Sequence, residues 1–168
     1  FYQLYFQEPG VADADLGRDP ATTMRRMLTG LSDQAGLTGA RDGRGMVERM
    51  SEPAGPPDWL TQADLDRYAA DFARTGFTGP LNWYRNIDRN WDLMSGFEGA
   101  KVTVPALFVA GGDDPVLAMG PPARMTKWVP DLRGVVLIDG AGHWIQQERP
   151  AEVNAALLDF LTGLHPAA

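Results

Sequence analysis

The sequence contains no cysteine and only two histidines among its 168 residues. The lack of cysteine excludes a disulfide framework and thiolate ligands for a metal. The two histidines, His143 and His165, lie too far apart to show the short spacing of a ligand pair. We therefore expect no metal site, no redox chemistry and no cofactor.

Positive charge and long apolar runs are also scarce. The 15 basic residues are outnumbered by 22 acidic ones, which gives a formal net charge of -7. No basic cluster is longer than Arg25-Arg26, so a surface that binds nucleic acid is not expected. No apolar run approaches the ~18 residues that cross a bilayer, and no signal-peptide pattern opens the chain. We expect a soluble, cytoplasmic protein without a membrane or nucleic-acid partner.

The second half of the sequence predicts alternating strands and helices. The apolar stretch 105–110 predicts a strand buried on both faces, and residues 133–139 predict a second one. A short helix is expected between them, after two prolines and before Pro130. A terminal helix is expected to begin at Pro150 and to pack one face on the sheet. The apolar positions of that face are Val153, Leu157, Phe160, Leu161 and Leu164.

The first half predicts helices and no strands. Thr61 and Asp64 resemble a capping box at the start of a helix that ends at Gly76. A second helix restarts at Pro80, and glycine, proline and charged residues predict a long loop over about 36–57. In that second helix an apolar stripe is expected from Tyr84, Ile87 and Trp91. The acidic residues read as solvated faces or helix caps are Asp13, Asp15, Glu48, Glu52 and Asp64.

Polar side chains follow both predicted strands. The first strand leads into GGDD, residues 111–114, and the second into GAGH, residues 140–143. In a right-handed strand-helix-strand unit both loops open at the same sheet edge, and neighbouring strands lie ~4.8 Å apart. An aspartate and His143 can therefore touch. A carboxylate that fixes the histidine tautomer leaves the other ring nitrogen free to accept a proton.

A purely structural interpretation of the same residues is equally open from spacing alone. Asp114 could cap the helical turn that begins near Pro115, and His143 could pack beside Trp144. Structural ion pairs also occur in such loops.

Longer motifs resemble a known family. "PALFVAGGDDPVL" and "AGHWIQQERP" are similar to the late acid and histidine loops of the α/β-hydrolase fold. "YQLYFQEPGVA" and "GFTGPLNWYRN" resemble the cap domain of soluble epoxide hydrolases, and the resemblance extends from residue 2 to about 163. It implies an α/β fold in which 1–98 form a helical cap and 99–168 form the last two strands and terminal helix of the hydrolase core.

The resemblance also implies an activity and a set of roles. In that family an aspartate attacks the epoxide and forms an alkyl ester, two cap tyrosines donate hydrogen bonds to the epoxide oxygen, and an Asp-His pair activates the water that cleaves the ester. The matching residues are Tyr2 and Tyr84 for the phenols, with Tyr5 as a competitor of Tyr2, Asp114 for the acid, with Asp113 as second choice, and His143 for the base. Contacts to the small-molecule epoxide are expected from Gln3, Met27, Trp83, Pro115, Val116 and Trp144, in a detoxifying role.

The family's nucleophile is not found in this sequence. Neither a G-x-[SDC]-x-G elbow nor an H-G-x-P segment occurs. We therefore expect the C-terminal part of a longer hydrolase, whose N-terminal half is absent here and is its required partner. The fragment alone is expected to be inactive. The sequence leaves open whether the protein forms a homodimer.

Two alternatives remain from the sequence. The first is a haloalkane or haloacid dehalogenase, and the second is a non-catalytic binding module derived from the same fold. The combined set of Tyr2, Tyr84, Asp114 and His143 favours an epoxide hydrolase over both.

Overall fold

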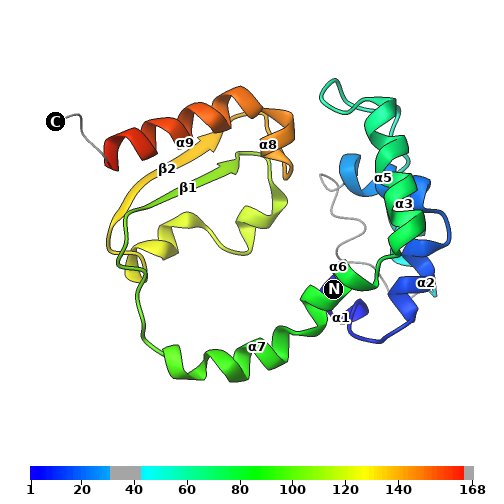
Figure 1. The fold of residues 1–168 in the computed structure, drawn as a ribbon, viewed down its shortest axis with the longest axis horizontal. Coiled ribbons are helices and arrows are strands. Elements are labelled where there is room, and N and C mark those ends of the chain that lie inside the picture. Colours follow the sequence, from blue (N-terminus) through cyan, green and yellow to red (C-terminus); the bar gives the residue numbers. More distant parts are fainter. Residues whose placement is uncertain (31–42, 165–168) are drawn as a thin grey trace. The chain divides into compact units, whose positions relative to one another are not determined.

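The computed structural model describes residues 1–30 and 43–164. The chain divides into two compact units, Phe1–Gly96 and Phe97–Ala168, each described here by itself (Figure 1). The division lies close to the boundary at residue 98 expected from the sequence. The assignment of these units to a cap and a core stays a prediction.

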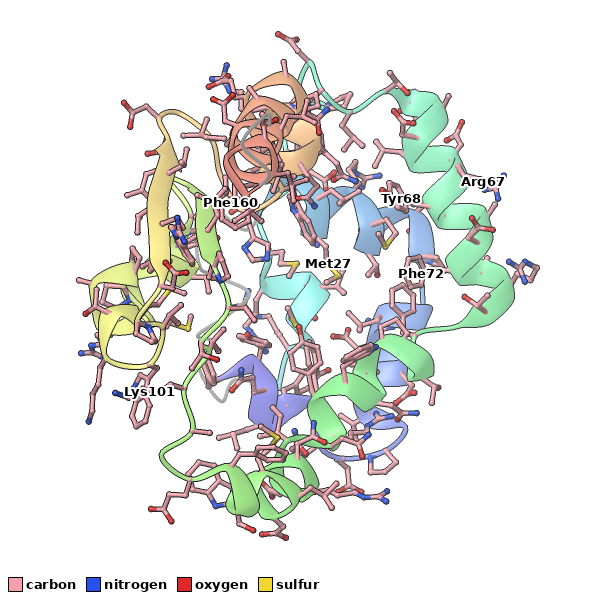
Figure 2. The ribbon with its side chains drawn as sticks, turned by 60° about the vertical axis from the view of Figure 1, so that its left-hand side comes forward. Met27, Arg67, Tyr68, Phe72, Lys101 and Phe160 are labelled. Atoms are coloured by element: carbon pink, nitrogen blue, oxygen red, sulfur yellow. The ribbon has the colours of Figure 1, made fainter. Side chains whose placement is uncertain are left out.

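The first unit is built from helices. Helices α3 and α5 pack against each other. Figure 2 shows Tyr68 and Phe72 on the side of α5 that faces α3, whereas Arg67 points away from it. The helices are α1 (Tyr2–Tyr5), α2 (Val11–Gly17), α3 (Pro20–Thr29), α4 (Met46–Arg49), α5 (Gln62–Thr75), α6 (Thr78–Arg85) and α7 (Ile87–Met94).

The bounds of α5 follow from local chemistry. The Thr61 hydroxyl accepts the backbone N–H of Asp64 at 3.1 Å, and the Asp64 carboxylate accepts the backbone N–H of Thr61 at 3.0 Å. This confirms the capping box, which satisfies two N–H groups that have no partner inside the helix. The helix ends at Gly76, whose φ of 68° is a conformation that glycine adopts without steric cost.

The prediction of a long loop over 36–57 is wrong in its second part. Its first part, to residue 42, lies outside the described residues. Met46–Arg49 form helix α4. Buried Asp15 accepts the N–H groups of Met46 and Val47 at 2.6 and 3.4 Å. A carboxylate at a helix start bonds N–H groups that lack partners and interacts favourably with the helix dipole. The partner lies 31 residues away, so composition could not indicate it.

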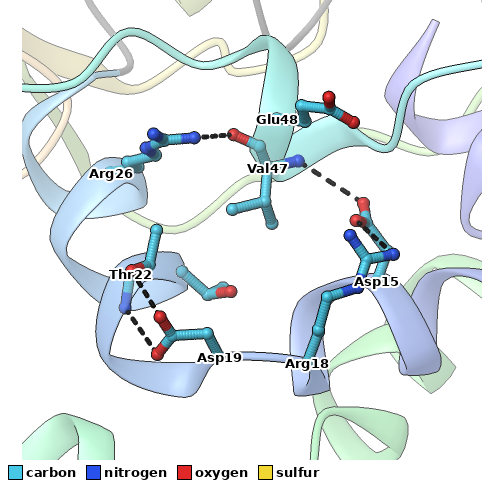
Figure 3. A pocket seen from close by; sticks show the side chains of 8 residues that line it. Asp15, Arg18, Asp19, Thr22, Arg26, Val47 and Glu48 are labelled. Carbon is cyan, nitrogen blue, oxygen red and sulfur yellow. Dashed lines mark hydrogen bonds and ion pairs between the residues drawn. The ribbon is translucent and has the colours of Figure 1, made fainter.

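A polar cavity of about 200 Å³ lies where α2, α3 and α4 meet (Figure 3). On one side Arg26 donates to the Val47 carbonyl at 2.8 Å, and on another Thr22 donates its N–H to Asp19 at 3.2 Å. The first bond ties α4 to α3, and the second caps the start of α3. The residues that line the cavity are Asp15, Arg18, Asp19, Thr22, Thr23, Arg26, Val47 and Glu48.

The prediction of one continuous helix after Pro80 is also wrong, because the chain forms two helices that are separated at Asn86. Helix α6 ends at Arg85 and α7 begins at Ile87. Asn86 donates its side-chain N–H to the Asn82 carbonyl at 2.7 Å, which ends α6 locally. The expected apolar stripe does not pack as one face, since Trp91 is 80% exposed.

The second unit contains a two-stranded parallel sheet within the described residues. Strands β1 (Ala106–Gly111) and β2 (Leu132–Ile138) pair in the register Val109 to Val136 and Gly111 to Ile138. Short 3₁₀ turns, η3 (Pro115–Ala118) and η4 (Pro122–Lys127), connect them. Helix α8 (Ile145–Glu148) and α9 (Pro150–Leu164) follow. Both expected strands and the terminal helix are confirmed.

The core of this unit is small. Ile138, Ala141 and Val153 are buried, so the terminal helix does contact the sheet, through Val153. Burial on both faces, expected for the strand at 105–110, is wrong, because residues 106–109 of β1 are only half-buried. On β2, Val135 and Leu137 remain 44% and 45% exposed. Two strands and one helix supply too few neighbours to cover both faces. The expected apolar face of α9 is also only partly covered, since Leu157 and Leu161 are 42% and 53% exposed.

Helix α9 has 15 residues, and crossing a bilayer takes about 20. Throughout residues 1–30 and 43–164, we find no helix with the length and apolar character needed to span a membrane.

The capping box gives a first prediction. In the full-length protein, Thr61→Ala removes the acceptor for the Asp64 N–H, so the first turn of α5 should open more often. We expect hydrogen exchange of that turn to become several-fold faster, as loss of an N-cap hydroxyl requires. The measurement is hydrogen exchange by mass spectrometry. Thr61→Ser keeps a hydroxyl and should leave exchange unchanged, and equal exchange in all three proteins would contradict the role of the cap.

Candidate active site

The two loops that follow the strands bring an acid and a histidine together. Asp114 lies three residues after the end of β1 and His143 lies five residues after the end of β2. Nδ1 of His143 is 3.0 Å from Oδ2 of Asp114. The contact expected between these side chains is therefore present.

Asp114 also caps the turn η3. Its Oδ1 accepts the N–H of Val116 at 2.8 Å while Oδ2 faces the imidazole. The structural and functional interpretations of Asp114 are thus compatible, because one oxygen serves each contact. The second choice, Asp113, has an exposed side chain, and its backbone N–H bonds the Ala141 carbonyl at 2.9 Å.

The pair fixes the histidine tautomer. An ionised carboxylate only accepts hydrogen bonds, so Nδ1 of His143 carries the proton in this contact, and in the neutral imidazole Nε2 then holds the lone pair. The Asp114 side chain is 12% exposed and that of His143 is 34% exposed. The imidazole therefore keeps access to solvent while its orienting carboxylate is mostly covered.

The loops approach each other closely enough to demand a glycine. A Cβ atom at Gly111 would overlap the carbonyl oxygens of Ala141 and Gly142. Only the absence of a side chain lets the backbone of the histidine loop rest on the end of β1.

The first unit holds a pair of phenols. The rings of Tyr2 and Tyr84 lie 5.6 Å apart and cross at 82°. Buried Phe6 contacts both rings, at 5.6 and 5.0 Å between centroids. Burial, and then the neighbouring Tyr2, raises the pKa of the Tyr84 phenol, which stays protonated and able to donate a hydrogen bond at neutral pH.

Tyr5 differs from Tyr2 in the use of its hydroxyl. The Tyr5 hydroxyl donates to Asp15 at 3.0 Å, and burial and this hydrogen bond raise the pKa of the Tyr5 phenol. Tyr5 therefore anchors α1 to α2. Asp15 is only 6% exposed, so of the two places expected for it, a solvated face or a helix cap, it takes the cap, at the start of α4.

An arginine ties the helix of Tyr84 to the segment of Tyr2. Arg85 donates to the Phe6 carbonyl at 2.9 Å and to the Asp13 carboxylate, which also accepts the Thr78 hydroxyl. The sequence placed Asp13 on a solvated face or at a helix cap and gave Arg85 no role. Asp13 does cap α2, because its carboxylate accepts the N–H of the N-cap residue Gly10 at 2.9 Å. The only local signal was the place of Arg85 directly after Tyr84.

The expected substrate contacts are spread over both units. Trp83 is 82% exposed and, with Gly79, Pro80 and Tyr84, lines an open hollow of about 590 Å³. Gln3 places its amide nitrogen 3.5 Å from the Tyr2 hydroxyl, and Met27 is half-buried on α3 (Figure 2). In the second unit Trp144 packs edge-on against His143 at 4.9 Å, and Pro115 and Val116 begin η3.

Metal ligands are not grouped in the part of the chain that the structure describes. No three His, Cys, Asp or Glu side chains gather there in a way that could hold a metal ion. The chemistry available from these two clusters is hydrogen-bond donation by phenols and proton transfer by an oriented imidazole.

A family model described as "Alpha/beta hydrolase family" matches residues 7–156. The chain belongs to the alpha/beta hydrolase family. The match includes Asp114 and His143 and most of the helical unit.

Several curated hydrolases named for epoxides are similar to this alpha/beta hydrolase chain. Epoxide hydrolase A of Mycobacterium tuberculosis is 54% identical over 169 residues, which cover 98% of this chain and 52% of that protein. Epoxide hydrolase 1 of Siraitia grosvenorii is 38% identical, over 96% of this chain and 52% of that protein. The chain thus spans about half the length of these curated relatives.

Solved structures agree with this fold. The crystal structure of epoxide hydrolase A from Mycobacterium thermoresistibile is 58% identical and matches with a TM-score of 0.88, over 97% of this chain and 52% of that one. An epoxide hydrolase from an endophytic Streptomyces is 40% identical, with a TM-score of 0.91 over 99% of this chain and 53% of that one.

The Arg85 contact generates a prediction about pH. Hydrogen bonds from Arg85 and Thr78 hold the pKa of the Asp13 carboxyl well below its usual range. The pKa of this carboxyl in the folded protein lies below its value in the unfolded chain, which is about 4. The ionised carboxylate therefore stabilises the fold fully above that pH, and the stabilisation is lost progressively as pH falls from there toward the folded pKa. In the full-length protein, Asp13→Asn should cost roughly 1 kcal/mol at neutral pH and progressively less in acid.

The measurement is urea unfolding of both proteins across this pH range. Asp92→Asn, on exposed α7, makes the same charge change and should show no such pH-dependent difference. A cost for Asp13→Asn that stays constant down to strongly acidic pH would contradict the ion pair.

Proposed function

We propose that the protein containing this chain hydrolyses epoxides to vicinal diols through an alkyl-enzyme ester. The observation that carries the proposal is the pairing of phenols at Tyr2 and Tyr84, together with the bond between Asp114 and His143. Its similarity to proteins named epoxide hydrolases adds support.

The first step forms the ester. A nucleophilic aspartate, proposed to lie outside these 168 residues, attacks an epoxide carbon; a new C–O ester bond forms while the ring C–O bond breaks. The electron pair of the broken bond stays on the epoxide oxygen. Tyr2 and Tyr84 donate hydrogen bonds to that oxygen, and one phenol supplies the proton that turns the alkoxide into a hydroxyl.

The second step cleaves the ester. Nε2 of His143 takes a proton from water, and the resulting hydroxide attacks the ester carbonyl and releases the diol with the aspartate restored. The Asp114 carboxylate, 3.0 Å from Nδ1, keeps the required tautomer and stabilises the imidazolium that forms. The proton on His143 then returns to the phenolate, so each cycle converts one epoxide and one water into the diol and needs no cofactor.

Location and partners follow from the same proposal. Epoxides alkylate nucleophiles and diols do not, so the activity suits detoxification by a cytoplasmic enzyme. The exposed Val135 and Leu137 on the sheet suit coverage by the remainder of the protein, which would also bring the nucleophile. A fragment of these 168 residues alone would then be inactive. A homodimer is compatible with the other exposed apolar residues.

The role of His143 can be tested by trapping the ester. In the full-length protein, His143→Gln should still form the ester but should fail to hydrolyse it, because only the second step needs the base. A covalent adduct with the mass of the substrate should accumulate in the mass spectrum of the intact protein. Normal turnover without an adduct would make His143 a structural residue.

The phenols are tested by removing their hydroxyl groups singly and together. The rate to measure is single-turnover ester formation from an epoxide by Tyr2→Phe, Tyr84→Phe and the double variant of the full-length protein. Loss of one donor should cost on the order of 2–4 kcal/mol in the barrier, and loss of both should nearly abolish ring opening. Phenylalanine keeps the ring contact with Phe6, so the change isolates the hydroxyl.

Tyr5→Phe is the matched control for this series. Its hydroxyl is bonded to Asp15, so its loss should leave ester formation much faster than in Tyr2→Phe. The reverse order would assign the role to Tyr5. Normal ester formation from the epoxide by all three single variants would contradict the role of the phenols. A parent protein that forms no ester from an epoxide would contradict the epoxide assignment and would make haloalkanes the next substrate to test.

A further inference from the structure

The loop that carries His143 is held by a side chain to which neither the motifs nor the resemblance gives a role. Glu148 is the last residue of α8. Its Oε2 accepts the N–H of Gly142 at 2.6 Å, and its Oε1 accepts the N–H of Trp144 at 2.9 Å. These are the residues directly before and after His143, so one carboxylate bridges the backbone on both sides of the imidazole.

The bridge depends on the short helix that follows the loop. The N–H of Glu148 donates to the Trp144 carbonyl at 2.9 Å, which closes a single turn. That turn brings the side chain of Glu148 back over the start of the loop. Trp144 is therefore bonded to Glu148 twice, once through its carbonyl and once through its N–H.

The opposite side of the loop is held by β1. The N–H of Asp113 donates to the Ala141 carbonyl at 2.9 Å. The backbone of Gly111 lies so close to the histidine loop that no side chain fits between them. Residues 141–144 thus have fixed points toward the strand and toward α8. Hydrogen bonds to an ionised carboxylate are about twice as strong as neutral ones, so the Glu148 side of this support is strong.

A carboxylate suits this position better than any neutral side chain of the same length. Both of its oxygens accept hydrogen bonds and neither donates. In Glu148→Gln one oxygen becomes an NH₂ group, which would face a backbone N–H donor. One of the two bonds around His143 would then be lost, and a part-buried N–H would be left without its acceptor.

We propose that Glu148 is a positioning residue that sets the orientation of His143 for ester hydrolysis. This inference rests on the proposed function, because it assumes that His143 is the base of the second step. The carboxylate contacts only the backbone of the loop and acts through the imidazole. It therefore affects hydrolysis of the ester and leaves its formation, which requires no base, unchanged.

The test separates the two steps in the full-length protein. Single-turnover ester formation and ester breakdown are followed by rapid quench and intact-protein mass spectrometry, with an epoxide as substrate. For Glu148→Gln we expect an unchanged rate of ester formation and a breakdown slowed about 10- to 100-fold, the effect of displacing a catalytic group by up to an ångström. The matched control is Glu98→Gln, which makes the same change on an exposed residue ahead of β1 and should alter neither rate.

A milder variant guards against misfolding. Glu148→Asp keeps the charge on a shorter side chain that cannot span both N–H groups, so its ester breakdown should lie between the parent and Glu148→Gln. Equal slowing of both steps in the folded variants, or no slowing of either, overturns the positioning role. If the parent protein forms no ester from an epoxide, the proposed function itself is overturned. If Glu148→Gln forms the ester and hydrolyses it at the parent rate, only this inference is overturned.

Discussion

Parallel pairing of β1 and β2 is the interaction on which the rest of the second unit depends. It ends both strands at the same edge, with Gly111 opposite Ile138. The pairing continues past the strands, because the N–H of Gly112 bonds the Ile138 carbonyl and that of Asp113 bonds the Ala141 carbonyl, both at 2.9 Å. The Asp114 and His143 contact is the next connection in this series, made by side chains instead of backbone.

In the first unit, two carboxylates on one short helix hold the neighbouring helices in place. Asp13 and Asp15 both lie on α2, but they bond different parts of the unit. Asp13 holds Arg85, and with it the helix of Tyr84. Asp15 holds the Tyr5 hydroxyl on α1 and the first N–H groups of α4. The mutual geometry of the two phenols is therefore set by charged groups that stand outside the aromatic cluster itself.

The features that the sequence predicted correctly are those with a local pattern. Apolar runs ending in glycines indicated the strands, and the general rule for parallel strands then placed Asp114 near His143. Thr61 and Asp64 are three residues apart, so their capping box was visible. The missed contacts are not local: Arg85 meets Asp13 across 72 positions, and Asp15 meets Met46 across 31. No periodicity links such residues, so α4 and the anchoring acids could not be found by pattern alone.

The paired glycines after β1 look alike in the sequence but differ in how much change they tolerate. A Cβ at Gly112 would come no closer than 3.4 Å to the Ile138 carbonyl oxygen, an ordinary contact distance. At Gly111 even a methyl group would push the histidine loop off the strand. Gly112 therefore has room for a side chain, whereas Gly111 belongs among the positions that a library of variants leaves untouched.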